Sequence, residues 1–427
     1  MTRVGLAVHR TFHSLHTRNF RLYFIGQVVS VTGTWLNATA SAWLVLRLSD
    51  SGFALGLNMA LTFLPILLVG AFGGMLADRY DKRKILISTQ AAYAVLAFTL
   101  FALVATDVAE LWMVYALSLA AGLVTALDNP TRQSFYMELV AEHDLTNAVS
   151  LNSAVFMGSR IVGASLAALV IKTIGLADCF LIDGVSYVAV IGALLAMRTQ
   201  DLHGRQGRKT GERGSVREGF RYVWRTPELR RPLVLMTIVF TFAFNWSVLL
   251  PLLAKRTFDG DAATFGVMSA LTGAGAFVAA LIMANRSSSS AAAPDFRRLS
   301  MWSVASGAAL LLTAVAPTLG LAYLSMLPLG LTVMIFIICA NSMLQLRSLP
   351  AFRGRVMALY GMVFLGSTPI GSVITGSLAE HMGARAGFVL GGGSALIAGI
   401  GGLWWRSRRS APSALPSDVF AEEQLSA

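Results

Sequence analysis

The sequence is organised as long apolar runs separated by short polar connections. Each run is long enough to cross a bilayer, because the hydrocarbon core requires about 20 helical residues. Lipid permits only helices or closed barrels, and the runs show no two-residue alternation of apolar and polar positions. The pattern therefore predicts an all-α polytopic membrane protein with 12 transmembrane helices. The predicted spans are 20–47, 54–77, 85–106, 110–128, 147–173, 178–197, 232–255, 262–285, 298–316, 319–341, 355–380 and 385–405.

The composition excludes a soluble globular chain. Hydrophobic residues make up 55% of the 427 positions and charged residues only 13%, about half of the roughly 25% typical of soluble domains. The net charge of +12 is carried by the connections and the termini. Because no soluble basic domain or aromatic RNA-binding motif accompanies this charge, nucleic acid is not an expected partner.

Positive charge is distributed unequally between the two faces of the predicted helix bundle. One face comprises both termini and the even-to-odd connections, and it holds 28 of the 34 Lys and Arg residues. The positive-inside rule then places both termini in the cytoplasm. The opposite face holds five basic residues, and the remaining one, Arg160, lies inside a span.

The longest connection divides six spans from six and sets the predicted domain organisation. Residues 198–231 form a basic cytoplasmic linker in which 215–226 is predicted to be an amphipathic helix beside the inner leaflet. The predicted divisions are an N-terminal cytoplasmic segment (1–19), an N-terminal six-helix bundle (20–197), this linker, a C-terminal six-helix bundle (232–405) and a disordered cytoplasmic tail (406–427).

The two halves resemble each other in sequence, which indicates an internal duplication and two pseudo-symmetric six-helix bundles. The matches fall in corresponding spans. They are Val155–Gly163 with Val363–Gly371 and Asn37 with Asn245 at an offset of 208, and Gly56 with Gly266 at an offset of 210. Parallel repeats of this kind place a substrate site between the halves, near the middle of the membrane.

The connection after the second span carries an acid and a basic cluster at fixed distances from a glycine. Gly70 and Gly74, four positions apart, predict the close approach of a neighbouring helix. Asp78, at the membrane boundary, is suited to pairing with a cation or capping an adjacent helix. A basic cluster follows it and is suited to anchoring the turn at anionic lipid.

This connection resembles the signature loop of the major facilitator superfamily, Gly-x-x-x-Asp-Arg-x-Gly-Arg-Arg. The resemblance implies the fold of that superfamily and a cytoplasmic gate, in which the loop holds helices together in the outward-open state. The matching positions are Gly74, Asp78, Arg79, Lys82 and Arg83. Asp81 stands where the family has glycine.

Two further stretches resemble the enterobactin-exporter and macrolide-efflux branch of that superfamily, the transmembrane secretion effector type. They are 158–163 in the fifth span, and 353–356 with 366–371 in the eleventh. The resemblance implies export of drugs, siderophores or other amphiphiles from a bacterial cytoplasm in exchange for protons. The implied helix-packing positions are Gly158, Gly163, Gly366, Pro369 and Gly371. Ala164 and Ala168 replace the proline and glycine usual in the fifth span.

Charged residues inside the spans are the candidates for coupling. Arg160 lies near the middle of the fifth span, where a charge is costly and faces the bundle interior or a wet cavity. It is either a substrate or coupling residue, or one half of a structural pair with a carboxylate or carbonyl groups. Asp183, six positions into the sixth span, is the candidate proton carrier, or a carboxylate at the wet end of a helix. Asp128, at the end of the fourth span, is predicted to be structural.

Polar and aromatic residues at mid-span are the candidates for lining a substrate cavity. They are Asn37, Asn58, Asn245, Trp35 and Trp246. Asparagine also joins membrane helices through hydrogen bonds, each contributing about 1 kcal/mol, and the tryptophans could instead face lipid. Both alternatives remain open from the sequence.

Catalytic chemistry and metal binding are not indicated. The six histidines lie in termini or connections, the two cysteines lie in separate spans, and no phosphate-binding glycine loop is present. We therefore expect no cofactor and no enzyme activity. The prediction is a monomeric secondary transporter of the bacterial inner membrane with a small-molecule substrate, protons as the coupling ion and membrane lipids as partners. An importer of the same fold and a non-transporting receptor or assembly factor are the alternatives.

Overall fold

The computed structural model describes residues 13–141, 144–202, 216–287, 295–349 and 352–407, and all regular structure in these ranges is helical. The long helices of the first half are α2 (Arg18–Ser49), α3 (Gly52–Arg79), α4 (Lys82–Ala105), α5 (Leu111–Leu139), α6 (Leu145–Thr173) and α7 (Leu176–Leu195). The helices of the second half are α9 (Pro227–Phe242), α10 (Trp246–Leu252), α11 (Ala262–Ser287), α12 (Phe296–Val315), α13 (Leu319–Arg347), α14 (Arg353–Met382) and α15 (Ala384–Ser407).

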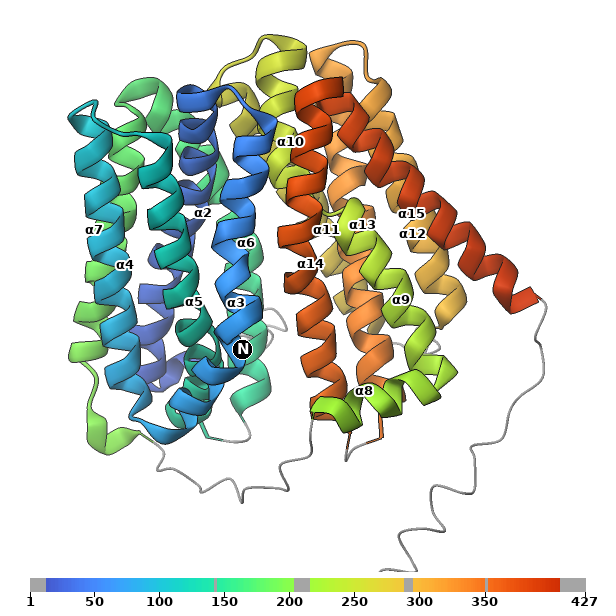
Figure 1. Ribbon diagram of the computed structural model, residues 1–427. Helices are drawn as coiled ribbons and strands as arrows, with labels where there is room; N and C mark the ends of the chain where they lie inside the picture. Colours follow the sequence, from blue (N-terminus) through green and yellow to red (C-terminus); the bar gives the residue numbers. More distant parts are fainter. Residues whose placement is uncertain (1–12, 142–143, 203–215, 288–294, 350–351, 408–427) are drawn as a thin grey trace, which may run out of the picture.

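The two halves form two helical bundles that stand side by side (Figure 1). In the first bundle, α3 packs on α5, α4 on α7, and α2 on both α6 and α7. In the second bundle, α12 packs on α15 and α13, and α11 packs on α13. The predicted all-α membrane fold with two bundles is confirmed.

The predicted number of 12 spans is not confirmed by apolar length alone. In the described ranges, ten helices are long and apolar enough to cross a membrane, with α9 to Thr257 counted as one. The two predicted spans missing from that set correspond to α2 and α6. Both are long, at 32 and 29 residues, but they carry polar residues such as Gln27, Asn37 and Arg160 along their length.

The seventh predicted span is interrupted, whereas the sequence predicts it as continuous over 232–255. Helix α9 ends at Phe242, α10 begins at Trp246, and a π-helical turn follows over Leu253–Thr257. In the interruption, the side-chain Nδ2 of Asn245 donates to the carbonyl of Thr241 at 2.7 Å. Transporters use such discontinuous helices where the backbone lines a site.

The short helix α8 (Val216–Arg225) marks one end of the molecule, which we call the linker end. It falls within the predicted amphipathic helix 215–226. Val223 is buried, whereas Phe220 and Trp224 are exposed and stack on each other with ring centroids 5.4 Å apart. Residues 203–215 and the tail from 408 lie outside the described ranges.

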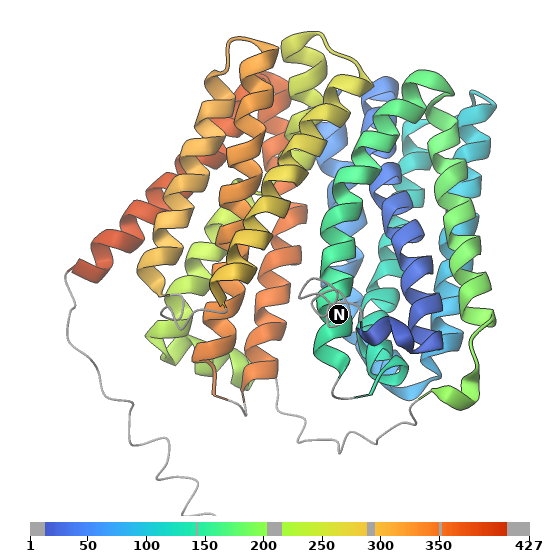
Figure 2. The ribbon, with the colours of Figure 1, turned by 180° about the vertical axis from the view of Figure 1, so that it is seen from behind.

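The most extensive contacts between the bundles are made by two helix pairs that are equivalent under the internal duplication, and α10 also touches α2 and α3. Helix α3 packs on α14, and α6 packs on α11, which is seen from behind in Figure 2. A Cβ at Gly56 of α3 would lie 2.9 Å from the carbonyl carbon of Ser372, and one at Gly266 would lie 3.1 Å from the carbonyl oxygen of Ala164. The glycines matched in the sequence therefore occupy matched positions in the two contacts.

Polar contacts between the bundles are confined to the half of the molecule away from the linker end. Among the described residues, every hydrogen bond and ion pair between the bundles joins α2, α3 or their connection to α14 or to the end of α10 and the turn after it. The structure is therefore closed at the end opposite the linker.

Adding a methyl group at Gly56 or Gly266 should loosen the contact between the bundles. The new Cβ would meet backbone atoms, and overpacking of this kind costs about 1–3 kcal/mol. We expect Gly56→Ala and Gly266→Ala to lower the thermal melting temperature of the purified protein. Gly393→Ala is the matched control, because a Cβ there meets no described atom within 4 Å. Equal melting temperatures for all three variants would contradict this account.

Candidate functional site between the bundles

Arg160 lies between two tryptophans, near the middle of α6. Its guanidinium carbon is 5.2 Å from the ring centroid of Trp35 on α2 and 5.1 Å from that of Trp246 on α10. Both distances are within the range of a cation–π interaction. One ring belongs to the first bundle and the other to the second, so this side chain joins the bundles at the level of the predicted substrate site.

Backbone geometry brings these three residues together. Gly163 lies one turn beyond Arg160 on α6, and a Cβ there would lie 2.6 Å from both Thr32 O and Trp35 Cβ. Because glycine occupies this position, α6 approaches α2 closely enough for Arg160 to reach the indole. Trp246 is the first residue of α10, directly after the interruption at Asn245.

Aromatic side chains surround the two tryptophans. Phe156, one turn before Arg160, packs edge-on against Trp35 with centroids 5.5 Å apart. Phe244 lies 4.1 Å from Trp246 and 5.5 Å from Phe364 of α14, centroid to centroid. The cation is therefore set in an aromatic environment contributed by both bundles.

The burial of Trp35 and Trp246 bears on the alternatives left open for these two residues. Trp246 is buried and Trp35 is half-buried, so the lipid-facing alternative is wrong for both. In the described part of the chain, the partners of Arg160 are the two indoles, and its role in substrate binding or coupling stays a prediction.

Asp183 and Asn37 form a second polar cluster, inside the first bundle. Asn37 Nδ2 donates to Asp183 Oδ2 at 2.6 Å, and Ser41 Oγ donates to Asn37 Oδ1 at 2.8 Å. Asp183 is fully buried, so it does not lie at a wet helix end. Its Oδ1 has no hydrogen-bond partner among the described residues. A Cβ at Gly33 would lie 2.7 Å from this oxygen, so the glycine provides the space for it.

The other two asparagines, Asn58 and Asn245, form hydrogen bonds away from Asp183. Asn58 accepts from Ser118 Oγ at 2.8 Å, which joins α3 to α5 within the first bundle. Asn245 closes the interruption of span seven, as described above, and a Cβ at Gly371 would lie 2.8 Å from its Nδ2. The structure therefore favours a helix-joining role for Asn58 and Asn245 over cavity lining.

The predicted gate segment lies at the linker end. Lys82 forms an ion pair with Glu138, and Arg83 Nε donates to Leu194 O at 2.8 Å. These bonds tie α4 to α5 and α7. Arg79 is exposed, and the side chain of Asp78 lies outside the described part of α3.

Asp81, which departs from the family motif, has a clear role at this turn. Its side-chain oxygen accepts from Lys84 N at 3.0 Å and thereby caps the start of α4. Capping satisfies one of the free amide groups of the first turn. The substituted position therefore supports helix formation.

The close approach predicted at Gly74 occurs one position earlier. A Cβ at Gly74 would meet no described atom within 4 Å, whereas one at Gly73 would lie 3.1 Å from Leu127 Cα of α5. The close contact predicted at Gly158 is likewise not seen, because a Cβ there meets no described atom within 4 Å. Gly163, Gly371 and Gly366 are at close contacts, the last against Leu67 of α3, and Pro369 is buried in α14.

A charge network near the linker end of the first bundle was missed in the sequence. The buried Asp128 accepts from Thr89 Oγ1 at 2.7 Å and from Gln90 Nε2 at 3.0 Å. Arg132, one turn later, donates to the same carboxylate at 2.6 Å and also to Gln27. Their spacing of four residues was the available signal, because residues i and i+4 face each other on a helix.

A second missed network closes the end opposite the linker. Lys255 Nζ lies 2.9 Å from Asp50 Oδ1, and Arg256 Nη2 lies 3.4 Å from Glu380 Oε2. Glu380 Oε2 also accepts from the backbone nitrogen of Gly52 at 2.5 Å. We call Asp50, Lys255, Arg256 and Glu380 the opposite-end network. Its residues are far apart in sequence, and no spacing rule connects them.

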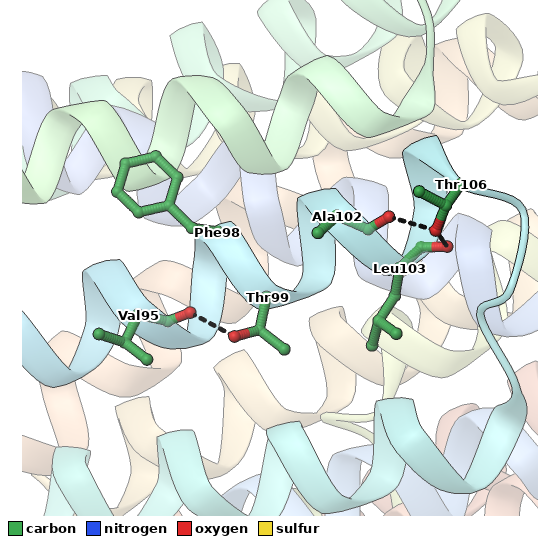
Figure 3. Close-up of a pocket in the computed structure, with 6 residues that line it drawn as sticks. All are labelled: Val95, Phe98, Thr99, Ala102, Leu103 and Thr106. Atoms are coloured by element: carbon green, nitrogen blue, oxygen red, sulfur yellow. Dashed lines mark hydrogen bonds between the residues drawn. The ribbon is translucent and has the colours of Figure 1, made fainter.

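A hollow of about 490 Å³ on α4 is not part of this site (Figure 3). It is lined by a single helix, and its threonines bond to their own helix, as in the 2.8 Å bond from Thr99 Oγ1 to Val95 O. Val95 is 63% exposed. Among the described residues, no unpaired polar side chain lines this hollow, so nothing in it indicates a binding site.

The two bundles, with the interrupted helix and the half-buried Arg160 between them, have the major facilitator fold. The fold is similar to that of a bacterial homologue of the human lysosomal transporter Spinster in an inward-facing, unoccupied conformation, with a TM-score of 0.70 and 12% identity over 93% of this chain and 99% of that chain. The nucleoside transporter NupG matches with a TM-score of 0.72 and 12% identity over 91% and 98% of the two chains.

The chain belongs to the transmembrane secretion effector family of this superfamily, whose sequence profile matches residues 9–427. Macrolide efflux protein A of Streptococcus pyogenes is 22% identical over 87% of this chain and 92% of that protein. The multidrug efflux pump Tap of Mycolicibacterium fortuitum is 26% identical over 86% and 91%. The staphyloferrin A transporter of Staphylococcus aureus is 22% identical over 62% of this chain, and the match spans 66% of that transporter.

Removing the charge of Asp128 should destabilise the first bundle strongly. Asp128→Asn leaves Arg132 without its counter-ion, and breaking a buried pair costs about 3–5 kcal/mol. We expect a clearly lowered melting temperature and partial recovery in Asp128→Asn/Arg132→Gln. The control is Asp107→Asn, whose exposed partner Arg47 is 3.8 Å away and whose loss costs less than about 1 kcal/mol. An equally mild effect at Asp128 would refute the structural role.

Proposed function

We propose that this major facilitator protein exports small amphiphilic organic compounds from the bacterial cytoplasm across the inner membrane in exchange for protons. Its relatives include efflux proteins for macrolides and other drugs and a transporter named for a siderophore. The observation that carries the proposal is Arg160 held by a tryptophan of each bundle, because a site shared by both bundles changes when they rock.

The linker end faces the cytoplasm in this proposal. The faces differ strongly in positive charge, and the linker end carries the excess. The opposite-end network then lies on the outer face and holds the transporter closed to the outside. Release of substrate outward requires these ion pairs to separate while the linker end closes.

The gate segment is proposed to stabilise the state that is closed to the cytoplasm. Gly74, Asp78, Arg79, Lys82 and Arg83 match the family motif in sequence. In the conformation described here, Lys82 and Arg83 bond within the first bundle. Asp78 and Arg79 are the positions proposed to engage the second bundle when the linker ends approach.

Asp183 is the proposed proton carrier. Its carboxylate is fully buried and lies near the middle of α7. One of its oxygens has no hydrogen-bond partner in the described structure. Asn37 donates to the other oxygen and comes from α2, the helix that also carries Trp35. Protonation of Asp183 therefore affects the same helix that contacts Arg160.

Efflux of a fluorescent amphiphile from preloaded vesicles, with and without an imposed pH gradient, tests the proposal. Wild-type protein should give gradient-dependent efflux. Asp183→Asn should lose at least about tenfold of gradient-driven efflux and keep gradient-independent exchange, because the substrate site is intact but no proton is carried. The control is Asn58→Ser, which alters a polar residue that bonds to Ser118 within the first bundle and forms no hydrogen bond with Asp183 or Arg160 in the described structure. Full gradient-driven efflux in Asp183→Asn would exclude Asp183 as the carrier.

Weakening the opposite-end network should favour the outward-open state. Lys255→Gln and Arg256→Gln each remove a partly exposed ion pair with Asp50 of the first bundle, and such pairs contribute about 0.2–1 kcal/mol apiece. We expect a shift of roughly two- to fivefold in the population open to the outside, measured by alkylation of a cysteine introduced on the outer half of α14. Arg385→Gln, which loses a bond to Ala316 within the second bundle, should leave the population unchanged. An unchanged alkylation rate in the network variants would contradict the latch.

A further inference from the structure

We propose that Arg160 is the recognition point for an anionic group, so that the transported compounds are amphiphilic organic anions, such as a carboxylate attached to an aromatic or apolar body. This inference rests on the proposed transport function and specifies its substrate class. It follows from three features of the side chains around Arg160.

The first feature is a cation near the middle of α6 that has no counter-ion among the described residues. No carboxylate among the described residues lies within ion-pair distance of Arg160, and none of its N–H groups donates a hydrogen bond there. Charges within a membrane are normally paired. Arg132, in the same bundle, shows the usual solution with Asp128 and Gln27. Arg160 is half-buried, so its charge remains accessible to a ligand.

The second feature is an additional donor beside the cation. Trp35 Nε1 is buried and has no hydrogen-bond partner among the described residues. A buried donor that remains unpaired costs about 1–3 kcal/mol. A ligand carrying several acceptor oxygens would meet both the guanidinium and, after a small rotation of the ring, this indole N–H.

The third feature is that the partners of Arg160 can be replaced. A cation–π contact contributes about 0.5–2 kcal/mol, whereas hydrogen bonds of a guanidinium to a carboxylate are charge-assisted and bidentate. An incoming anion would therefore displace one indole from Arg160. Since Trp246 belongs to the second bundle and Trp35 to the first, displacement of Trp246 would also loosen the contact between the bundles.

The surroundings define the rest of the ligand. Phe156, Phe244 and Phe364 lie around the tryptophans and present ring surface to an apolar or aromatic body. A cationic amphiphile would meet the same rings but would face the like charge of Arg160. The site therefore discriminates by charge among compounds of the same shape.

The test compares ligands that differ only in charge. Binding of 2-naphthoate, its neutral analogue 2-naphthamide and the cation 2-naphthylmethylammonium is measured on the full-length protein in nanodiscs. The same measurement is made with the carboxylate and carboxamide of anthracene and of biphenyl. In the wild type, the carboxylate of each pair should bind at least about tenfold more tightly than its amide. Arg160→Gln should abolish this difference, and Arg160→Lys should keep the preference with weaker binding.

The outcomes separate this inference from the proposed function. Equal binding of carboxylate and amide in every pair, no binding of any carboxylate, or an undiminished preference in Arg160→Gln would each overturn it. The wild-type comparison needs no variant and stands even if Arg160→Gln fails to fold. Gradient-driven efflux without charge preference would overturn the anion site alone. Charge-selective binding without flux in reconstituted vesicles would overturn transport and leave the anion site in place.

Discussion

A charge inside a membrane protein must be compensated by the protein itself, because lipid offers neither counter-ions nor hydrogen bonds. This chain compensates its membrane-embedded arginines in two ways. Arg132 lies beside Asp128 and Gln27 within one bundle, and its bonds hold three helices together. Among the described residues, Arg160 is held by two ring faces, one from each bundle. The first arrangement is fixed by strong bonds, whereas the second is weak enough to be exchanged for a ligand.

The duplication gives the two bundles a pair of equivalent contacts, and the bundles meet at these contacts. Gly56 against Ser372 and Gly266 against Ala164 are equivalent contacts, and both allow backbones to approach closely. Close backbone packing depends on short-range contacts and involves few strong directional bonds. Such contacts can separate when the bundles rock. The opposite-end network adds ion pairs of modest strength at the end of the molecule opposite the linker.

The sequence predicted the architecture well and the site only in part. Apolar runs of sufficient length determine the fold class, and the offset of 208 between Gly163 and Gly371 located two positions where helices do meet. Arg160 was singled out because a charge in an apolar run is rare. Its partners could not be predicted, since Trp35 and Trp246 come from different bundles and their contact depends on how the bundles sit together. The break before Trp246 has no proline at the break itself and leaves no clear signal.

That break has a mechanical consequence for the site. If span seven were one continuous helix, the segment that carries Trp246 would share the axis of α9. It could then not change its orientation independently of α9. The interruption at Ala243–Asn245 separates α10 from α9, while Asn245 still bonds back to Thr241. Helix α10 leads directly into the turn that carries Lys255 and Arg256. If Trp246 moved away from Arg160, α10 would move with it. The turn after α10 would then shift, together with the ion pairs that its basic residues form with Asp50. In the mechanism proposed above, this short segment between the two breaks links binding of an anion at Arg160 to opening of the end opposite the linker.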